Sequence, residues 1–226
     1  MEHRHSRSEI LLGKTALARL QKAKVGVLGL GGVGSYACEA LARAGIGHLV
    51  LIDPDLVSES NLNRQLVALE SNLGQPKVLA MAERIRQIDS SLKLTLCQQA
   101  YQPGSGSMLT GLDFVLDAID DLPAKIDLLA YCHQQQIPLI SCMGAGNKLD
   151  PTAFQIADLF ATSVCPLAKI LRQKLRAKGI SSGIPVVFST ESPQAVGAAI
   201  GSVSFVPAVA GLTLASYVIK KLAGCS

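Results

Sequence analysis

The chain has 226 residues, of which 49% are hydrophobic and 17% charged, and its net charge is +4. This length and composition exclude a disordered chain and suffice for one domain with a buried core. Its 20 glycines and 10 prolines follow no period, which excludes a collagen-like chain. Only 4% of residues are aromatic, which disfavours a base-stacking platform for single-stranded nucleic acid.

Short apolar runs alternate with helical patterns over the first two thirds of the chain. We expect strands at residues 25–28, 48–52, 92–98, 114–118 and 138–142, and helices at residues 7–20, 35–44, 75–87 and 122–136. This alternation predicts βαβ units, and therefore a Rossmann-like, doubly wound α/β fold whose sheet is mainly parallel.

The pattern changes after residue 146. We expect a C-terminal β/α extension made of a turn into a strand near 154–156, a helix at 166–177, a strand at 185–188 and a helix at 207–222. No stretch has the composition of a linker between domains. We therefore predict a single domain over residues 1–226, with a nucleotide-binding core at about 20–146 and a substrate or dimer region at about 147–226.

An uncharged stretch covers residues 192–219 and is long enough to cross a membrane. Its glycines and prolines are spaced as expected for turns followed by a buried core helix, so we favour a soluble chain over a membrane span. The N-terminal segment is polar, with no apolar segment behind it, and the six cysteines form no C-x-x-C pair. We expect a cytoplasmic protein with reduced thiols and no zinc.

A glycine-rich loop links the first strand to the next helix. It contains Gly29, Gly31, Gly32 and Gly34, and Asp53 ends the following strand nineteen residues after Gly34. Glycine lets backbone N–H groups approach a phosphate at a helix N-terminus, and an acid at this spacing binds ribose hydroxyls. The glycines can also serve close helix–strand packing alone, but the complete context favours nucleotide binding.

Polar residues after Asp53 favour a triphosphate over a nicotinamide nucleotide. Arg64 and Lys77 can neutralise phosphate oxygens, and Asn61 can hold the leaving group in line. A dehydrogenase needs no such cluster beside its ribose-binding acid. The candidate nucleotide-binding residues in this segment are Asp53, Asp55, Asn61, Arg64, Gln65 and Lys77.

Two acids, Asp117 and Asp120, lie at the carboxyl end of the strand expected at 114–118. They fall at the carboxyl edge of the sheet, where open α/β sheets bind ligands. A carboxylate there can hold Mg²⁺ beside phosphate oxygens. We therefore predict that ATP and Mg²⁺ bind at this edge.

These motifs resemble the adenylation domain of the ubiquitin-activating-enzyme superfamily, which includes the molybdopterin and thiamine sulfur-carrier adenylyltransferases. The resemblance implies that Asp53 binds ribose and Asp120 binds magnesium, with catalytic contacts to the phosphates from Asn61, Arg64 and Lys77. It also implies a homodimer, in which Arg7 is supplied in trans to the partner's ATP. The matching segments are the glycine loop, Asp53-Pro54-Asp55, Asn61-Leu62-Asn63-Arg64-Gln65, Gly74-Gln75-Pro76-Lys77 and Leu116-Asp117-Ala118-Ile119-Asp120.

The C-terminal third resembles the tRNA threonylcarbamoyladenosine dehydratases, a branch of that superfamily. This resemblance implies an ATP-dependent dehydration of N6-threonylcarbamoyladenosine at position 37 of tRNA to its cyclic form, through an acyl-adenylate and without an enzyme cysteine. The matching segments are Gly144-Ala145-Gly146, Asp150-Pro151, Asp158-Leu159, Val187-Phe188-Ser189-Thr190-Glu191-Ser192-Pro193 and Gly201-Ser202-Val203-Ser204-Phe205-Val206-Pro207.

Three other functions stay open at this point. The first is an adenylyltransferase that activates the C-terminus of a ubiquitin-like sulfur-carrier protein, and a sulfur-transfer protein partner is also open for the dehydratase. The second is a catalytically silent nucleotide-binding scaffold, which the complete set of polar site residues disfavours. The third is a Rossmann oxidoreductase.

A few further side chains have open roles. The helix near residues 166–178 carries five cations and no acid, so it either contacts RNA phosphates or is a solvated face. Roles for Cys142, Cys165 and Glu191 are undecided. The four histidines show no spacing typical of metal ligands.

Overall fold

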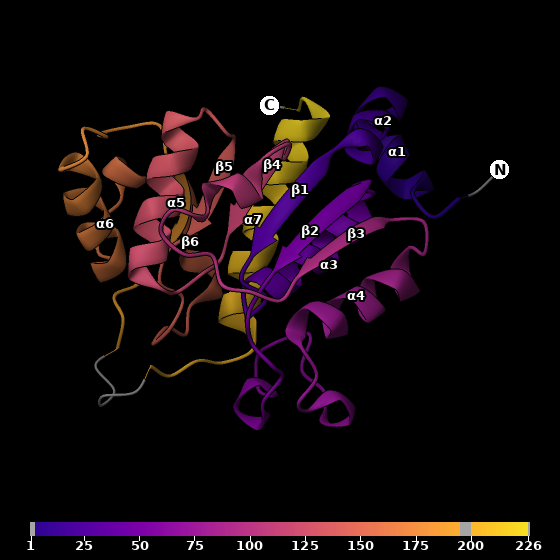
Figure 1. The fold of residues 1–226 in the computed structure, drawn as a ribbon, viewed down its shortest axis with the longest axis horizontal. Helices are drawn as coiled ribbons and strands as arrows, with labels where there is room; N and C mark the ends of the chain where they lie inside the picture. The colour runs from indigo at the N-terminus through magenta and orange to yellow at the C-terminus, as the bar shows by residue number, and fades with distance from the viewer. Residues whose placement is uncertain (1–2, 195–199, 226) are drawn as a thin grey trace.

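The computed structural model describes residues 3–194 and 200–225. They form one seven-stranded sheet in the order β3-β2-β1-β4-β5-β7-β6, with helices on both faces (Figure 1). Neighbouring strands are parallel except for β6, which runs antiparallel to β7. The predicted Rossmann-like α/β fold, mainly parallel and with a C-terminal β/α extension, is confirmed.

The strands lie within one or two residues of the predicted positions. Their bounds are β1 Lys24–Leu28, β2 His48–Ile52, β3 Lys93–Cys97, β4 Phe114–Asp117, β5 Leu139–Cys142, β6 Phe154–Asp158 and β7 Pro185–Ser189. The α-helices are α1 Ser6–Leu12, α2 Lys14–Lys22, α3 Gly34–Ala44, α4 Lys77–Ile88, α5 Leu122–Gln134, α6 Pro166–Arg176 and α7 Phe205–Ala223.

The single opening helix predicted over residues 7–20 was wrong. Gly13 has φ 85° and ψ 157°, and this backbone conformation separates α1 from α2. Glycine reaches positive φ at little cost, so the chain can turn sharply there. The apolar spacing on either side of Gly13 carries no sign of this break.

Two hydrophobic cores lie on the two faces of the sheet. Alternate strand residues point to opposite faces, so Val27 belongs to the core under α2, α3, α4 and α7, while its neighbour Leu28 belongs to the core under α5 and α6. Both side chains are fully buried. Because helices cover both faces, ligands can approach the sheet at the ends of its strands, and at the carboxyl edge the glycine loop follows β1.

Helix α7 is a core element of the fold. Within the described residues it is the one helix long and apolar enough to cross a membrane, with a mean hydropathy of 1.3. It packs tightly on α3, because a Cβ added at Gly211 would lie 2.2 Å from the carbonyl oxygen of Val33. This packing supports the interpretation as a core helix, although residues 195–199 of the uncharged stretch lie outside the described residues.

Candidate nucleotide-binding site

The glycine loop between β1 and α3 needs its glycines for steric reasons. Gly29 has φ 88°, and a Cβ there would lie 2.7 Å from the carbonyl oxygen of Ala118. A Cβ on Gly34 would lie 1.8 Å from the carbonyl oxygen of Gly29. At Gly31, in contrast, an added Cβ would meet only Gln65 Nε2, at 3.8 Å. The backbone is therefore tightly packed around Gly29 and Gly34, and there is open space beside Gly31, as phosphate binding requires.

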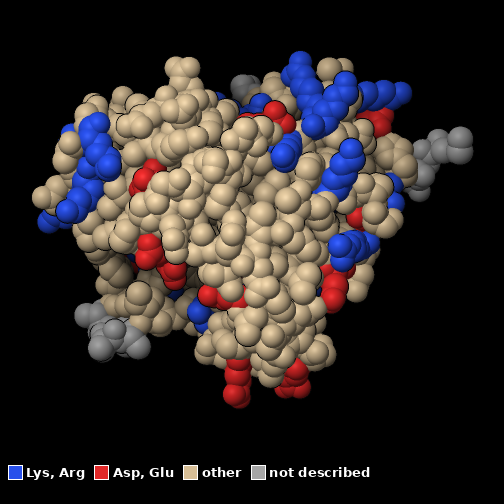
Figure 2. All heavy atoms as spheres, viewed as in Figure 1, with Lys and Arg blue, Asp and Glu red and all other residues tan. Residues whose placement is uncertain are grey.

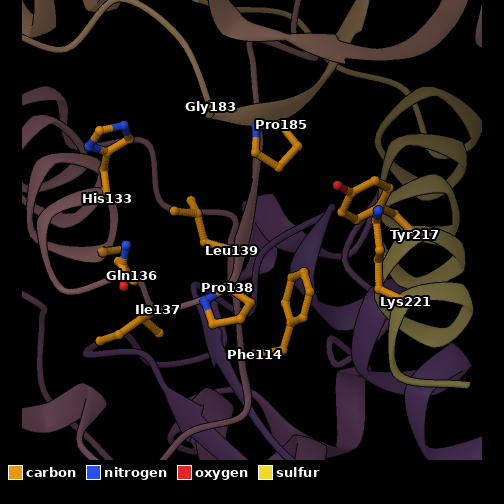
Figure 3. Close-up of a pocket in the computed structure, with 11 residues that line it drawn as sticks. Phe114, His133, Gln136, Ile137, Pro138, Leu139, Gly183, Pro185, Tyr217 and Lys221 are labelled. Carbon is orange, nitrogen blue, oxygen red and sulfur yellow. The ribbon is translucent and has the colours of Figure 1, made fainter. Parts of the chain in front are cut away.

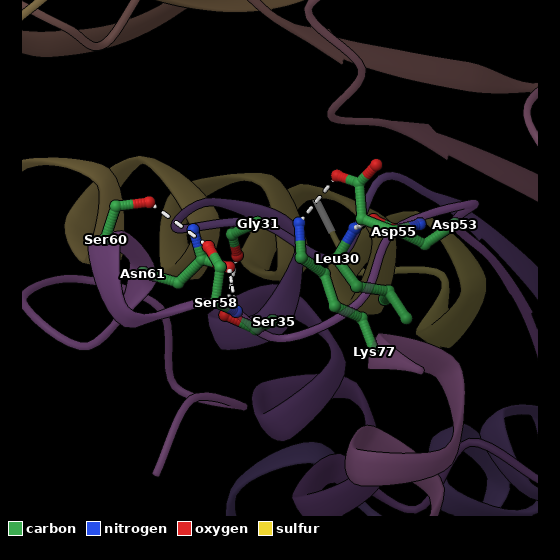
Figure 4. Close-up of polar contacts among 9 residues, drawn as sticks. All are labelled: Leu30, Gly31, Ser35, Asp53, Asp55, Ser58, Ser60, Asn61 and Lys77. Carbon is green, nitrogen blue, oxygen red and sulfur yellow. Dashed lines mark hydrogen bonds and ion pairs between the residues drawn. The ribbon is translucent and has the colours of Figure 1, made fainter. Parts of the chain in front are cut away.

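Asp53 lies beside this loop at the end of β2 (Figure 4). It is buried, and its two carboxylate oxygens accept the N–H groups of Leu30 at 2.6 Å and Asp55 at 2.8 Å. Burial raises the pKa of Asp53, although these two N–H groups and the nearby Lys77 oppose the rise. Each oxygen keeps a further lone pair, so the carboxylate can also accept ribose hydroxyls.

Lys77 is held beside the same loop by Asp55. Its Nζ lies 2.7 Å from Asp55 Oδ2, and its backbone N–H donates to the Asp55 carbonyl at 2.9 Å. The Lys77 side chain is only 6% exposed, whereas that of Asp55 is 61% exposed. The structure therefore brings Asp53, Asp55 and Lys77 together beside the glycine loop, with the Lys77 ammonium paired to Asp55.

Asn61 and Gln65 lie buried on the other side of the glycine loop, in and after the 3-10 helix η1 (Glu59–Asn61). The Asn61 side-chain oxygen accepts the N–H of Ser58 at 3.2 Å. Gln65 Oε1 is buried and finds no hydrogen-bond donor among the described residues. A buried acceptor without a donor is costly, so a ligand hydroxyl or a water molecule is expected at this position.

Arg64 is oriented by groups from its own turn. Its Nη1 donates to the Ser60 carbonyl at 2.8 Å and to Asn63 Oδ1 at 3.0 Å. Asn63 in turn donates from Nδ2 to the Ser202 carbonyl at 3.0 Å. The segment before α7 thus reaches the candidate phosphate site, a contact across 139 positions that sequence spacing could not reveal.

The two acids at the carboxyl end of β4, Asp117 and Asp120, have different environments. Asp117 is fully buried and forms an ion pair of 2.8 Å with the fully buried Lys125, and it also accepts the Ser141 hydroxyl at 2.6 Å. Asp120 is exposed. In the described part of the chain, no group of three or more His, Cys, Asp or Glu side chains could hold a metal ion. The Asp120 carboxylate is therefore accessible from solvent, whereas the Asp117 carboxylate is enclosed and already paired.

Lys125 was missed by the sequence analysis. It lies on the buried face of α5, and its Nζ also donates to the Ile119 carbonyl at 2.9 Å. A lysine among apolar residues of a helix is rarely buried without a partner, so its position was the available sign. The pair with Asp117 fixes the loop that carries Ile119 and Asp120.

Arg7 lies at the opposite edge of the sheet from the glycine loop. His5, two residues before Arg7, packs against Gly45 and lies 3.8 Å from Asp89, at the C-terminal ends of α3 and α4. These helices run back from the carboxyl edge, so their ends mark the amino edge (Figure 1). Beside Arg7 is a hollow of about 520 Å³, next to the 79% exposed Ile10. Within one chain, Arg7 and the other candidate residues are therefore not brought together.

Buried thiols and Glu191 have structural roles. Burial raises the pKa of Cys132 and of Cys142 to about 12, and Cys165 is also buried. The thiols of Cys132 and Cys142 therefore stay protonated at neutral pH and are poor nucleophiles. The Glu191 carboxylate accepts the backbone N–H groups of Leu149 and Asp150, each at 2.9 Å. It therefore holds the loop after β5.

A separate cavity of about 290 Å³ opens at the amino edge of the sheet (Figure 3). Phe114 and Leu139 form its floor, His133 lies on one side, and Tyr217 and Lys221 of α7 lie on the other. The Lys221 ammonium lies 5.4 Å from the centre of the Tyr217 ring. This cavity is distinct from the nucleotide site, which lies at the carboxyl edge.

Comparison with known proteins identifies the family. The ThiF family matches residues 5–226. The chain belongs to the ThiF family. It is 44% identical to the tRNA threonylcarbamoyladenosine dehydratase of Bacillus subtilis over 98% of this chain and 95% of that protein. The crystal structure of the Escherichia coli dehydratase TcdA in complex with ATP superposes with a TM-score of 0.93 at 40% identity, covering 98% of this chain and 94% of that one.

More distant members of the family match a smaller part of the chain. The molybdopterin-synthase adenylyltransferase of Salmonella typhimurium is 36% identical over 58% of this chain and 52% of that protein. These similarities confirm the predicted adenylating family and its dehydratase branch.

Proposed function

We propose that this chain is an ATP-dependent enzyme that dehydrates N6-threonylcarbamoyladenosine at position 37 of tRNA to its cyclic form. The observation that carries the proposal is the 44% identity to a dehydratase over 98% of the chain. The sulfur-carrier alternative has less support, because the molybdopterin-synthase adenylyltransferase of Salmonella typhimurium matches only 58% of the chain. Residues 1–226 act as a single domain in this proposal, in the cytoplasm, where tRNA is available.

The site fits ATP. Space above Gly31, the unpaired Gln65 Oε1 and the buried Lys77 form a cradle with acceptor and cationic groups on its walls. In the proposal Asp53 accepts the ribose hydroxyls, and Lys77 and Arg64 meet the phosphates. Gly29, Gly32 and Gly34 shape the loop, and Asn61 and Asp55 complete the binding set.

Asp120 is the residue proposed to hold Mg²⁺. It is exposed at the carboxyl edge, whereas the Asp117 carboxylate already forms an ion pair with Lys125 and a hydrogen bond with the Ser141 hydroxyl. Mg²⁺ commonly uses one or two carboxylates together with substrate phosphates, so a single acid is sufficient. When bound, the ion neutralises charge on the departing pyrophosphate.

The proposed reaction has two steps on one substrate. The carboxylate of the threonylcarbamoyl group attacks the α-phosphorus of ATP, which forms an acyl-adenylate and releases pyrophosphate. An atom of the ureido group then attacks the activated carbonyl, and ring closure expels AMP. Because the nucleophile belongs to the substrate, the protonated buried thiols described above are not needed, and positioning and charge stabilisation supply most of the rate.

A homodimer would complete the site with Arg7 from the partner. Support comes from the position of Arg7 at the far edge of its own subunit and from the exposed apolar side chains of α1, with Ile10 79% and Leu11 84% exposed. Exposed apolar residues of this size beside a hollow are typical of protein interfaces. A sulfur-transfer protein partner stays a prediction.

ATP–pyrophosphate exchange tests the proposed function. We expect exchange to be stimulated by tRNA that carries threonylcarbamoyladenosine and not by a ubiquitin-like sulfur-carrier protein with a C-terminal Gly-Gly. The matched control is the same tRNA without the modification. Stimulation by the carrier protein alone would establish the alternative function.

A further inference from the structure

Helix α6 presents an unusually cationic face. Its Ala168, Leu171 and Leu175 are buried in the core, Leu167 and Arg172 are partly buried, and its other residues are exposed. Residues 159–190 contain no acidic residue. Figure 2 shows lysine and arginine atoms gathered over this end of the molecule. The cations of α6 and the following turn are Lys169, Arg172, Lys174, Arg176 and Lys178.

These cations form two rows, one on each side of the buried stripe. Lys169, Arg172 and Arg176 are spaced by three and four residues and therefore share one side of the helix. Lys174 and Lys178 are spaced by four and continue along the other side. Between the rows lies the most exposed face of α6.

Contacts within the chain orient Arg172 and Arg176 but do not neutralise the five cations. Arg172 Nη1 donates to the Thr162 carbonyl at 3.0 Å, and the Arg176 guanidinium lies 5.5 Å from the centre of the Phe160 ring. No salt bridge between described residues involves any of the five cations. The three lysines are exposed, so their charges are available to an external anion.

Helix α6 begins at the edge of the sheet that holds the candidate active site. The Cys165 sulfur, immediately before the helix, would lie 3.9 Å from a Cβ on Gly144. Gly144 follows β5, which runs parallel to β4 and β1, so it lies at the same edge as the glycine loop. With 11 residues, α6 extends about 16 Å away from that edge.

We infer that α6 and its following turn bind the phosphate backbone of the tRNA substrate while the modified nucleotide occupies the active site. The inference rests on the proposed function. An RNA stem carries phosphates on both sides of its wide, shallow minor groove. Two rows of cations on one helix match such a pair of phosphate lines, and each contact adds affinity by releasing counterions.

The test is tRNA binding by a charge-neutralised variant, Lys169→Gln/Lys174→Gln/Lys178→Gln, measured over a range of salt concentrations. The slope of log K against log salt should fall by about three, one for each lysine. Affinity at about 0.1 M salt should fall on the order of 100-fold. ATP binding, measured separately, should not change, because none of these lysines is part of the nucleotide site.

The matched control is Lys22→Gln/Lys93→Gln/Lys220→Gln, which removes the same charge from exposed lysines on α2, β3 and α7. It should retain both tRNA affinity and salt slope. Equal tRNA affinity in the α6 variant and the unaltered protein would overturn this inference, and so would an equal loss of tRNA affinity in both variants. In either case, dehydration by the unaltered protein would still support the proposed function. Absence of both tRNA binding and dehydration in the unaltered protein would overturn the two together.

Discussion

Replacing Lys125 by methionine should destabilise the protein strongly, because it leaves a buried carboxylate without its cation. Lys125 and Asp117 are both 0% exposed, and their charged groups are 2.8 Å apart. Methionine has nearly the same length and fits the same apolar surroundings. The substitution therefore removes the charge and its hydrogen bonds without creating a large cavity.

The expected loss follows from the contacts that remain. Breaking a buried ion pair by removing one partner costs about 3–5 kcal/mol. Asp117 keeps the Ser141 hydroxyl at 2.6 Å and the Ile119 N–H at 3.1 Å, which favours the lower end of that range. Loss of the bond from Lys125 to the Ile119 carbonyl adds about 1 kcal/mol. We expect a total of about 4 kcal/mol.

Urea unfolding at a fixed protein concentration measures this loss. The double variant Asp117→Asn/Lys125→Met removes both charges and should recover most of the stability. Lys93→Met, at an exposed position, is the matched control and should change the free energy of unfolding by less than about 0.5 kcal/mol. A loss below about 1 kcal/mol in Lys125→Met, or no recovery in the double variant, would refute the reasoning.

Three predictions concern the candidate site. Asp120→Ala should lower adenylation on the order of 100-fold or more while the urea midpoint stays unchanged, and full activity would contradict the magnesium role. Because burial raises the pKa of Asp53, ATP affinity should fall as the pH is lowered and this carboxylate takes up a proton. The variant Asp53→Asn should bind ATP weakly at every pH, and the same pH dependence of ATP affinity in this variant as in the unaltered protein would contradict the ribose role. Arg7→Ala and Lys77→Ala should each be inactive alone, but an equal mixture after subunit exchange should recover about a quarter of the sites; no recovery despite demonstrated exchange would contradict the trans role.

Local sequence patterns predicted the sheet and the glycine loop because both are specified by neighbouring residues. Apolar runs bounded by glycine define β1 and β2, and steric needs define Gly29 and Gly34. The same patterns placed Asp53 beside the loop, since the carboxyl ends of parallel strands meet at one edge.

Long-range contacts could not be predicted in this way. The bond from Asn63 to the Ser202 carbonyl joins residues 139 positions apart, and the pair of Asp117 with Lys125 depends on how α5 packs on β4. The role of Arg7 depends on a second subunit. The chemical roles assigned to the individual site residues stay predictions until the variants are measured.

Nucleoside analysis of tRNA tests the central claim most directly. Transfer RNA carrying threonylcarbamoyladenosine would be incubated with the protein, ATP and Mg²⁺, digested, and examined by mass spectrometry under conditions that preserve the cyclic product. We predict that the modified nucleoside becomes lighter by one water, that the change requires ATP, and that AMP forms in equal amount. An unchanged nucleoside in the presence of protein that binds ATP and tRNA would contradict the account.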